Sequence, residues 1–307
     1  MKNVIDPVDK TLIINELTPE KFLRKTNNGG NELYILNYYN APNAMREIGR
    51  LRELTFRQAG GGTGKDIDID KFDTQKEPYE QLITWDPEDQ EISGGYRFHV
   101  CNKKSDPENL ATSKLFGFSE DFSKNYLPYM IELGRSFIQP KYQSASAGRK
   151  GLFALDNLWD GLGALIVDNP EVKYYFGKVT MYTHFNKEAR NMVLYFLRTQ
   201  FPDPEKMVYP KIPLDLGIDD EKLAKIFNKS DYKSNYKILQ KKVREFDLNI
   251  PPLINTYMNA SSSMKFFGTA INKAFGGVEE SGILITIDDI FTAKRERYVN
   301  TYIDSKE

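Results

Sequence analysis

The chain has 307 residues, of which 40% are hydrophobic and 28% are charged, and its formal net charge is -1. This length and composition are typical of a globular protein with a substantial core, and the near-zero charge gives no overall electrostatic attraction for nucleic acid. One cysteine and two histidines are too few for a disulfide framework or a His/Cys metal centre, so we expect no bound metal.

Residues 1–7 lack the apolar stretch of a signal peptide. The longest apolar runs of the chain are far shorter than the roughly 20 residues of a membrane-spanning helix. These features predict a cytoplasmic protein, and they are compatible with peripheral contact at a membrane.

The N-terminal part of the chain combines short strand signals with one long helix. Residues 11–14 and 33–39 are rich in strand-forming residues. The sequence Thr-Pro-Glu at 18–20 is a helix-start signal, because proline is favoured in the first turn. Residues 43–58 are expected to form a helix capped by Asn43, which must end before the glycines at 60–62.

The remaining elements are a mixture of strands and helices. The predicted strands cover residues 79–85, 91–100, 128–139, 173–182 and 282–287, and the predicted helices cover residues 152–168, 186–200, 219–228, 231–246 and 251–260. The charged segment 202–250 reads as a helical insertion. We therefore expect a single α/β domain over residues 1–307, with a mixed sheet flanked by helices.

Six charged residues from separate segments stand among apolar or glycine-rich neighbours. They are Arg52, Asp70, Asp73, Arg97, Glu132 and Arg135. Burying such groups is costly unless they meet partners of opposite charge. The set is therefore either a functional site or a group of structural ion pairs that lock the first long helix to the sheet, and the residues alone leave both interpretations open.

The connection at 143–151 consists mainly of small residues and leads into the helix expected at 152–168. Backbone N–H groups at a helix N-terminus bind phosphate well, and Arg149 and Lys150 add positive charge. An ordinary flexible connection is an equal alternative, since the segment matches neither the P-loop nor the dinucleotide-binding glycine pattern.

Three other side chains are candidates for chemistry. His99 and His184 are candidate bases, although lone histidines are more often structural. Cys101 is a weaker candidate nucleophile, because no histidine, asparagine or acid around it forms a recognisable pattern.

An ordered set of segments over residues 45–290 carries a family resemblance. The segments are Leu51-Arg52 with Phe56, Asp70-Lys71-Phe72-Asp73, Gly94-Gly95-Tyr96-Arg97-Phe98, Glu132-Leu133-Gly134-Arg135-Ser136-Phe137, Leu158-Trp159, Pro251-Pro252-Leu253 through Tyr257, and Phe275-Gly276. In their order and spacing they resemble the acyl carrier protein-dependent N-acyltransferases that begin ornithine-lipid and glycine-lipid synthesis, once labelled hemolysin-like. This branch of the GNAT superfamily is related to the acyl-homoserine-lactone synthases. The glycines at 60–62 and the insertion at 202–250 depart from the family pattern, which puts the substrate in doubt more than the reaction.

The resemblance implies a GNAT-like, mostly antiparallel central sheet and a thioester donor. The pantetheine arm of the donor, from acyl carrier protein or coenzyme A, would pair with strand 128–139 like an added strand. Its phosphate end would meet the next helix. The residues implied in donor binding are Phe137, Ser144, Gly148, Arg149, Lys150 and Gly151.

The implied reaction is direct attack by the amine of a small amino acid on the thioester of a (3-hydroxy)acyl chain. Glu132 is the expected base, Arg135 is expected to support it, and Asp70 and Asp73 would position the amine. Arg97 and Arg135, with Arg52 in the same set, would hold the carboxylates or bind the amino acid's carboxylate. Glu132→Gln is expected to remove most of the turnover and leave the fold intact.

Glycine, ornithine, serine and lysine remain open as acceptors, with glycine or ornithine favoured by analogy. An acidic carrier protein would require a basic rim, and the expected rim consists of Lys103, Lys104, Lys141, Arg149, Lys150, Lys173 and Lys178. Two alternatives stay open: an acyl-homoserine-lactone-synthase-like enzyme, and a non-catalytic GNAT-fold protein that binds acyl thioesters.

Overall fold

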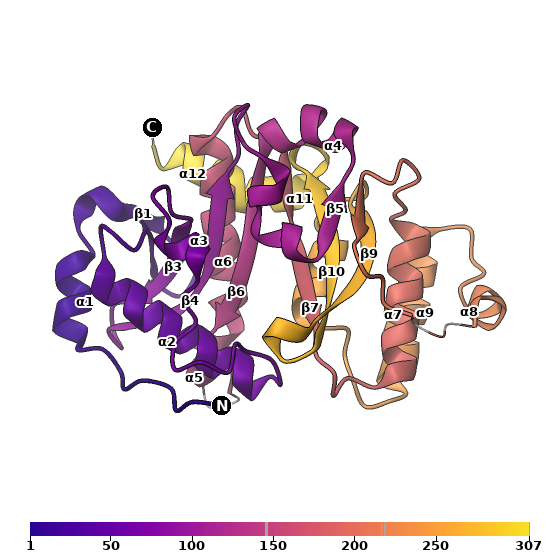
Figure 1. Ribbon diagram of the computed structural model, residues 1–307, viewed down its shortest axis with the longest axis horizontal. Helices are drawn as coiled ribbons and strands as arrows, with labels where there is room; N and C mark the ends of the chain where they lie inside the picture. Colours follow the sequence, from indigo (N-terminus) through magenta and orange to yellow (C-terminus); the bar gives the residue numbers. More distant parts are fainter. Residues whose placement is uncertain (145–146, 216, 218, 307) are drawn as a thin grey trace.

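A single large sheet organises the computed structural model, which describes residues 1–144, 147–215, 217 and 219–306 (Figure 1). The strand order is β1-β2-β3-β4-β6-β7-β10-β9. Its strands are β1 (Phe22–Lys25), β2 (Glu32–Leu36), β3 (Glu80–Asp86), β4 (Glu91–Val100), β6 (Met130–Ile138), β7 (Tyr174–Met181), β9 (Lys265–Asn272) and β10 (Val278–Thr286). A small second sheet pairs β5 (Phe116–Phe118) with β8 (Val208–Pro210).

Neighbouring strands of the large sheet run antiparallel, apart from β6 and β7, which run parallel. Parallel neighbours need a crossover connection, and α6 (Gly148–Asp168) provides it between these two strands. The predicted fold class, an α/β fold with a mixed and mostly antiparallel sheet, is therefore confirmed.

Helices cover both faces of the sheet (Figure 1). The alternation of side chains along β3 shows how: Leu82 belongs to the cluster that packs against α6, whereas Ile83 belongs to the cluster that packs against α2. The helices are α1 (Lys10–Glu16), α2 (Pro42–Gln58), α3 (Lys71–Thr74), α4 (Glu120–Asn125), α5 (Pro140–Gln143), α6, α7 (Lys187–Gln200), α8 (Asp220–Ile226), α9 (Tyr232–Arg244), α10 (Pro252–Met258), α11 (Thr292–Arg295) and α12 (Thr301–Asp304).

The predicted helical insertion is built into the core. Leu223 and Phe227 at α8, and Leu239 and Val243 on α9, are buried in the same hydrophobic cluster as α6 and α7. The segment also contributes β8, which the sequence did not indicate. Whether residues 1–307 behave as one domain stays a prediction, which this shared cluster supports.

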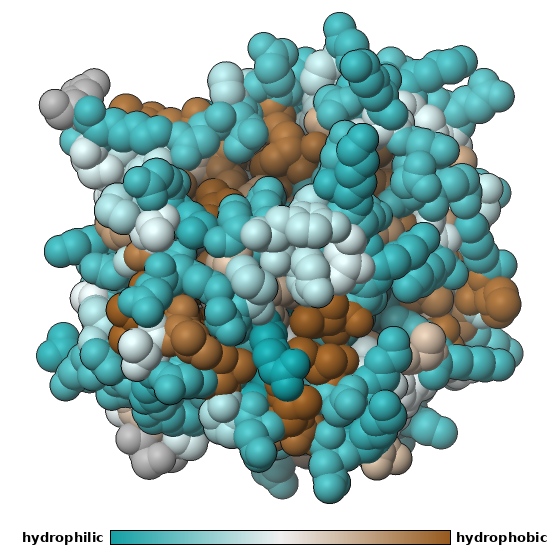
Figure 2. Space-filling model, turned by 60° about the vertical axis from the view of Figure 1, so that its left-hand side comes forward, coloured by the Kyte–Doolittle hydropathy of each residue, from teal (hydrophilic) through white to brown (hydrophobic). Residues whose placement is uncertain are grey.

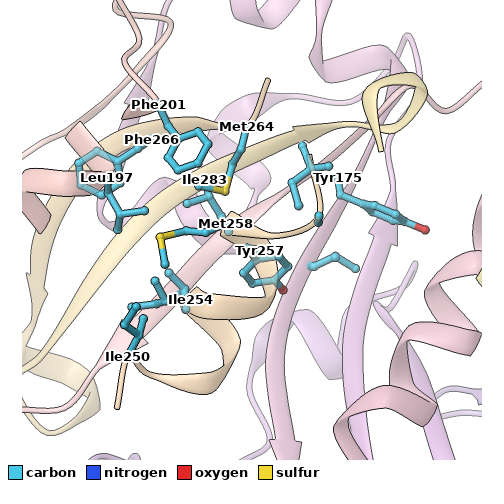
Figure 3. Packing of buried hydrophobic residues seen from close by; sticks show 14 of the residues in the cluster. Tyr175, Leu197, Phe201, Ile250, Ile254, Tyr257, Met258, Met264, Phe266 and Ile283 are labelled. Carbon is cyan, nitrogen blue, oxygen red and sulfur yellow. The ribbon is translucent and has the colours of Figure 1, made fainter. Parts of the chain in front are cut away.

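The C-terminal half of the core is shown in Figure 3. Ile254, Tyr257 and Met258 of α10 lie between α7 and strands β9 and β10, close to Leu197 and Ile283. This packing is important for the site, because the first residues of α10, Pro252 and Leu253, line the cleft described below.

Residues 11–14 form part of helix α1, so the predicted strand was wrong. The Asp9 side chain accepts a hydrogen bond from the Thr11 backbone N–H at 2.8 Å and caps the helix. Ile13 is buried, while Leu12 and Ile14 are exposed. A run of four residues, three of them apolar, is too short to separate a helix from a strand. Helix α2 also starts one residue earlier than expected, with Pro42 in its first turn.

No helix in the described ranges is long and apolar enough to cross a membrane. The face in Figure 2 is mainly hydrophilic, with hydrophobic residues visible in the hollows between charged and polar ones. Scattered apolar exposure of this kind is normal for a folded protein.

Candidate active site

The central feature of the site is a fork between the two parallel strands. β6 and β7 pair only where Met130–Leu133 of β6 lies beside Tyr174–Gly177 of β7. Beyond this point β6 continues to Ile138 alongside β4, and β7 continues to Met181 alongside β10. The two strands therefore diverge, and each leaves one edge free of the other.

A β-bulge marks the start of the fork. One residue of β4, Tyr96, faces two residues of β6, Arg135 and Ser136. Arg135 takes a left-handed backbone conformation with φ 50°, which a bulge of this kind can require. Bulges bend a strand and increase its twist, so this one turns β6 away from β7.

The fork opens into a cleft of about 730 Å³, a size typical of a small-molecule site. The walls come from both diverging strands, the end of α2, the first turns of α6 and the segment before α10. The wall residues include Gly134, Arg135, Ser136, Phe137, Ser144, Gly148, Gly151, Lys178, Thr180, Tyr182, His184, Pro251, Phe275 and Glu280.

A smaller cavity of about 30 Å³ adjoins the cleft and shares Gly134, Ser136 and Lys178 with it. It is bounded by Tyr175 and Tyr257, which belong to the hydrophobic cluster shown in Figure 3. The cavity thus connects the fork with the apolar interior.

Five of the six predicted charged residues meet beside the fork. Arg97 pairs with Asp70 at 2.8 Å and with Asp73 at 3.1 Å. Arg52 pairs with Asp73 at 3.3 Å, and both side chains are fully buried. Arg135 lies 3.7 Å from Asp70, so the ion pairs form one connected network.

The sequence prediction missed two members of this network. The Nε atom of Arg135 lies 2.8 Å from Asp68, which is almost fully buried. Gln81 accepts a hydrogen bond from Arg52 and donates one to Asp73 at 3.2 Å. Asp68 stands in the acidic run 66–73, but nothing in that run shows which carboxylates face inward.

Local structure explains why two of the acids are held so firmly. Asp70 and Asp73 form the capping box of α3. The Asp70 carboxylate accepts from the Phe72 N–H at 2.9 Å, and the Asp73 carboxylate accepts from the Asp70 N–H at 2.9 Å. The arginines thus bind carboxylates that the backbone has already oriented.

The electrostatics favour the ionised form of both acids. Burial alone would raise the pKa of Asp70, but Arg97 and Arg135 outweigh burial and lower the pKa to about 2. Burial would also raise the pKa of Asp73. Arg52 and Arg97 outweigh it and lower the pKa of Asp73 below its ordinary value.

The lowered pKa makes Asp70 a source of pH-dependent stability. Its contribution is present above the unfolded pKa of about 4 and is lost as the pH falls towards 2. We expect Asp70→Asn to reduce the free energy of unfolding by about 2 kcal/mol at pH 7 and by only a small part of that at pH 2, where the carboxylate is partly protonated in the folded protein. Urea unfolding across this pH range measures the difference. Asp66→Asn is the control, because Asp66 is 45% exposed, and a loss that is independent of pH would contradict the argument.

Glu132 lies outside the arginine network. Its carboxylate accepts hydrogen bonds from the Tyr79 hydroxyl at 2.5 Å, the Ala111 N–H at 3.1 Å, and the N–H and hydroxyl of Thr112 at 2.8 and 2.6 Å. The predicted support of Glu132 by Arg135 is therefore wrong: Arg135 bonds instead to Asp68 and Asp70. Glu132 is also 1% exposed and is not a wall residue of the cleft.

Only some of the residues expected to bind the donor lie in the wall of the cleft. Phe137, Ser144, Gly148 and Gly151 line the cleft, whereas Arg149 is exposed and is not part of its wall. Ala145 and Ser146, from the predicted phosphate loop, lie outside the described residues.

The predicted basic rim is partly neutralised. Lys150 is surrounded by three acids, its Nζ lying 2.9 Å from Asp86, 3.0 Å from Glu88 and 2.9 Å from Asp89. Two other lysines of the rim also pair with carboxylates, Lys141 with Asp89 and Glu91, and Lys178 with Glu280. The prediction that these three lysines offer free charge to a partner is corrected accordingly.

The other candidate side chains are also placed. His99 stacks on Tyr79 with ring centroids 4.7 Å apart, and burial lowers its pKa. Cys101 is buried, which raises the pKa of its thiol, so a reactive thiolate is not favoured. His184 lines the cleft and stacks on Tyr182.

The sequence prediction missed one pair in the cleft. Lys178 of β7 bonds to Glu280 of β10 at 2.5 Å, with side chains 14% and 3% exposed. The sequence could have indicated Lys178, because it is a charged residue inside the predicted strand 173–182. Glu280 lies just before the predicted strand 282–287, where a carboxylate is unremarkable.

Comparisons with known proteins show the family of the chain. A family model described as the acetyltransferase (GNAT) domain matches residues 51–150. A glycine N(alpha)-acyltransferase of Bacteroides thetaiotaomicron is 54% identical over 309 residues, which cover 99% of this chain and 92% of that protein. A glycine N(alpha)-acyltransferase of Phocaeicola vulgatus is 50% identical over 307 residues, which cover 99% of this chain and 94% of that one. The chain belongs to this family of N-acyltransferases.

The predicted resemblance to GNAT-superfamily N-acyltransferases is therefore confirmed, and so is the prediction of an enzyme. Among solved structures, FeeM, an N-acyl amino acid synthase from uncultured soil microbes, aligns with this N-acyltransferase at a TM-score of 0.44 and 8% identity, covering 86% of this chain and 97% of FeeM. The relatives are named for the transfer of an acyl group to the amine of glycine.

Proposed function

We propose that this N-acyltransferase moves an acyl chain, including 3-hydroxyacyl chains, from the thioester of an acyl carrier protein to the amine of glycine. The observation that carries the proposal is the forked cleft between β6 and β7, in a chain 50–54% identical to glycine N(alpha)-acyltransferases. The product is an N-acyl amino acid. Glycine is preferred to ornithine because both relatives are named for glycine.

The donor would lie along β6. Residues Gly134–Ile138 have β4 on one side and the cleft on the other, so an extended pantetheine arm can add itself as a strand. Its phosphate end would reach the first turn of α6, where Ser144, Gly148 and Gly151 line the cleft. The acyl chain would pass from the fork into the small cavity beside Tyr175 and Tyr257.

The reaction needs no covalent enzyme intermediate. The amine nitrogen bonds to the thioester carbon, and the carbon–sulfur bond breaks as the amide forms and the thiol leaves. Backbone N–H groups of β6 at the fork would stabilise the negative oxygen of the tetrahedral intermediate. The amine arrives protonated, so a base beside the cleft must first remove a proton.

The acid–arginine network would position the site. Arg135 is its member in the cleft wall, and it packs over the ring of Phe275 with 4.5 Å between its guanidinium carbon and the ring centroid. Arg135 contacts Asp70. The rest of the network, Arg97, Asp73 and Arg52, holds Asp70 in position. We propose this positioning role for them, in place of direct contact with the amine.

The proposed carrier-protein donor is supported by one exposed basic face. Lys233, Lys237, Lys241 and Arg244 follow one side of α9 and are exposed. Within the described part of the chain, none of the four is in an ion pair with a carboxylate. Carrier proteins are acidic, and α9 leads directly into the cleft wall at Pro251.

Incubation with 3-hydroxyacyl carrier protein and single amino acids tests the proposal. We expect thiol release and N-acyl product with glycine, lower rates with ornithine, serine or lysine, and lower kcat/KM with acyl-coenzyme A. Lactone formation from S-adenosylmethionine would instead indicate an acyl-homoserine-lactone-synthase-like enzyme. Thiol release with none of these acceptors would indicate a non-catalytic thioester-binding protein.

Glu132→Gln tests the predicted base. The four donors around Glu132 suit two carboxylate oxygens, and the glutamine amide would direct N–H groups against two of those donors. We therefore expect a loss of about 1–3 kcal/mol in the free energy of unfolding, together with reduced turnover. If Glu132→Gln keeps an intact fold but loses all turnover, Glu132 would instead be the catalytic base.

A further inference from the structure

The cleft contains one ion pair with no part in the scheme above. Lys178 and Glu280 come from neighbouring strands and project from the same face of the sheet, since Glu280 lies opposite Thr180 in the β7–β10 ladder. All three residues line the cleft. Among the wall residues of the cleft, Lys178 and Glu280 therefore bring a positive and a negative charge to one point.

The pair has unused hydrogen-bonding capacity on both sides. Both hydrogen bonds to Glu280 end on Oε2, one from Lys178 at 2.5 Å and one from Asn272 at 3.2 Å. No described residue donates to Oε1. A lysine ammonium has three donors, and Lys178 uses one of them here. One carboxylate oxygen and two N–H groups are therefore left for a ligand in the cleft.

We propose that Lys178 and Glu280 bind the acceptor amino acid as a zwitterion and that Glu280 is the catalytic base; this rests on the proposed function. The carboxylate of glycine accepts hydrogen bonds from the two remaining N–H groups of Lys178. The ammonium of glycine donates to Oε1 of Glu280. A zwitterion has the same two charges as the ion pair in the opposite order, so the pair stays intact while the ligand binds.

The chemistry follows from this placement. Oε1 of Glu280 takes one proton from the ammonium, which frees the nitrogen lone pair to attack the thioester carbon. The carbon–sulfur bond then breaks, and the thiolate takes the second proton that the nitrogen loses on becoming an amide. The proton on Glu280 returns to solvent after the product leaves.

Lys178→Met and Glu280→Gln test the two roles separately. Losing a charge-assisted hydrogen bond should raise the KM for glycine in Lys178→Met by about 10- to 100-fold, with the KM for the acyl donor unchanged. Removing the base should lower kcat in Glu280→Gln by about 100-fold or more.

Glycinamide, which lacks the carboxylate, separates binding from a structural effect. The wild type should prefer glycine, and Lys178→Met should lose that preference while its use of glycinamide stays unchanged. Equal effects of Lys178→Met on both acceptors, or glycine kinetics within twofold of wild type in either variant, would overturn the proposal.

Glu279→Gln is the matched control. Glu279 is the preceding residue of β10 and pairs with Arg190 at 2.5 Å, with side chains of 13% and 12% exposure. It is not a wall residue of the cleft, so its loss should leave both KM values and kcat unchanged. A fall in kcat as large as that of Glu280→Gln would assign both effects to strand packing.

If the single variants fail to fold, the double variant Lys178→Glu with Glu280→Lys tests whether the ion pair binds the zwitterion. It keeps an ion pair between β7 and β10, but it reverses the order of charge that the zwitterion meets. We expect a folded protein with glycine acylation lost, and wild-type glycine kinetics would overturn the proposal. Failure of the wild type to acylate glycine at all would instead reject the proposed function.

Discussion

Gly134→Leu should lower kcat/KM for the acyl donor by about 100-fold, because the leucine side chain would block the edge of β6 where the donor pairs and remove several kcal/mol of donor binding. The melting temperature should stay unchanged. A Cβ atom built on Gly134 meets no atom within 4 Å. Its φ is not in the left-handed region, so a side chain causes no backbone strain there. Gly134 lines both cavities, at the point where the thioester would lie.

Gly177→Ala is the contrasting variant on the facing strand. A Cβ atom there would lie 2.5 Å from the carbonyl oxygen of Leu133, so β6 and β7 would have to separate. Stability should fall in Gly177→Ala but not in Gly134→Leu. Thermal unfolding and steady-state kinetics on both variants measure this, and wild-type kinetics in Gly134→Leu would show that the donor does not lie in the fork.

The fork itself was not predictable from sequence alone. The strands beside the fork were predictable, because residues 91–100 were predicted with the observed bounds of β4 and the bounds predicted for β6 differ by one or two residues. However, the length of the paired segment depends on a bulge, and a bulge is set by the partner strand. The sequence around Gly134 and Arg135 does not predict the bulge, because the bulge depends on how β6 pairs with β4.

The charged residues show the same limit at the level of single contacts. The sequence indicated correctly that buried carboxylates and arginines need each other. It placed Glu132 with Arg135, although residues three apart on a strand face opposite sides. The structure gives them separate partners, Tyr79 and Thr112 for one and Asp68 for the other.

Strand β9 was missed for a comparable reason. Its sequence, Lys265–Asn272, contains Gly268 with φ +86°, and the β9–β10 ladder shifts register opposite this region. An irregular strand does not alternate cleanly, so its period cannot be recognised in a short window. The turn that follows β9 carries Phe275 into the cleft wall. The sequence indicated Phe275-Gly276 as part of the family pattern, but not its place in the wall.

Arg52→Met should cost about 3–5 kcal/mol in the free energy of unfolding, because it leaves a buried carboxylate with less compensation. Arg52 and Asp73 are both 0% exposed, and Gln81 bonds to each of them. Equilibrium urea unfolding at pH 7 measures the loss. We also expect lower turnover, since Asp73 and Asp70 are both held by Arg97, and Asp70 lies beside Arg135 in the cleft wall.

Arg50→Met is the matched control on the same helix. Arg50 pairs with Glu47 at 2.6 Å, with side chains 14% and 10% exposed, so its loss should cost less than the loss of the fully buried Arg52. The double variant Arg52→Met with Asp73→Asn should recover part of the lost stability, because it removes the uncompensated charge together with its partner. Equal losses in Arg50→Met and Arg52→Met would contradict a network whose strength depends on burial. Recovery of stability without recovery of turnover would show that the network acts through the position of Arg135 rather than through the stability of the fold.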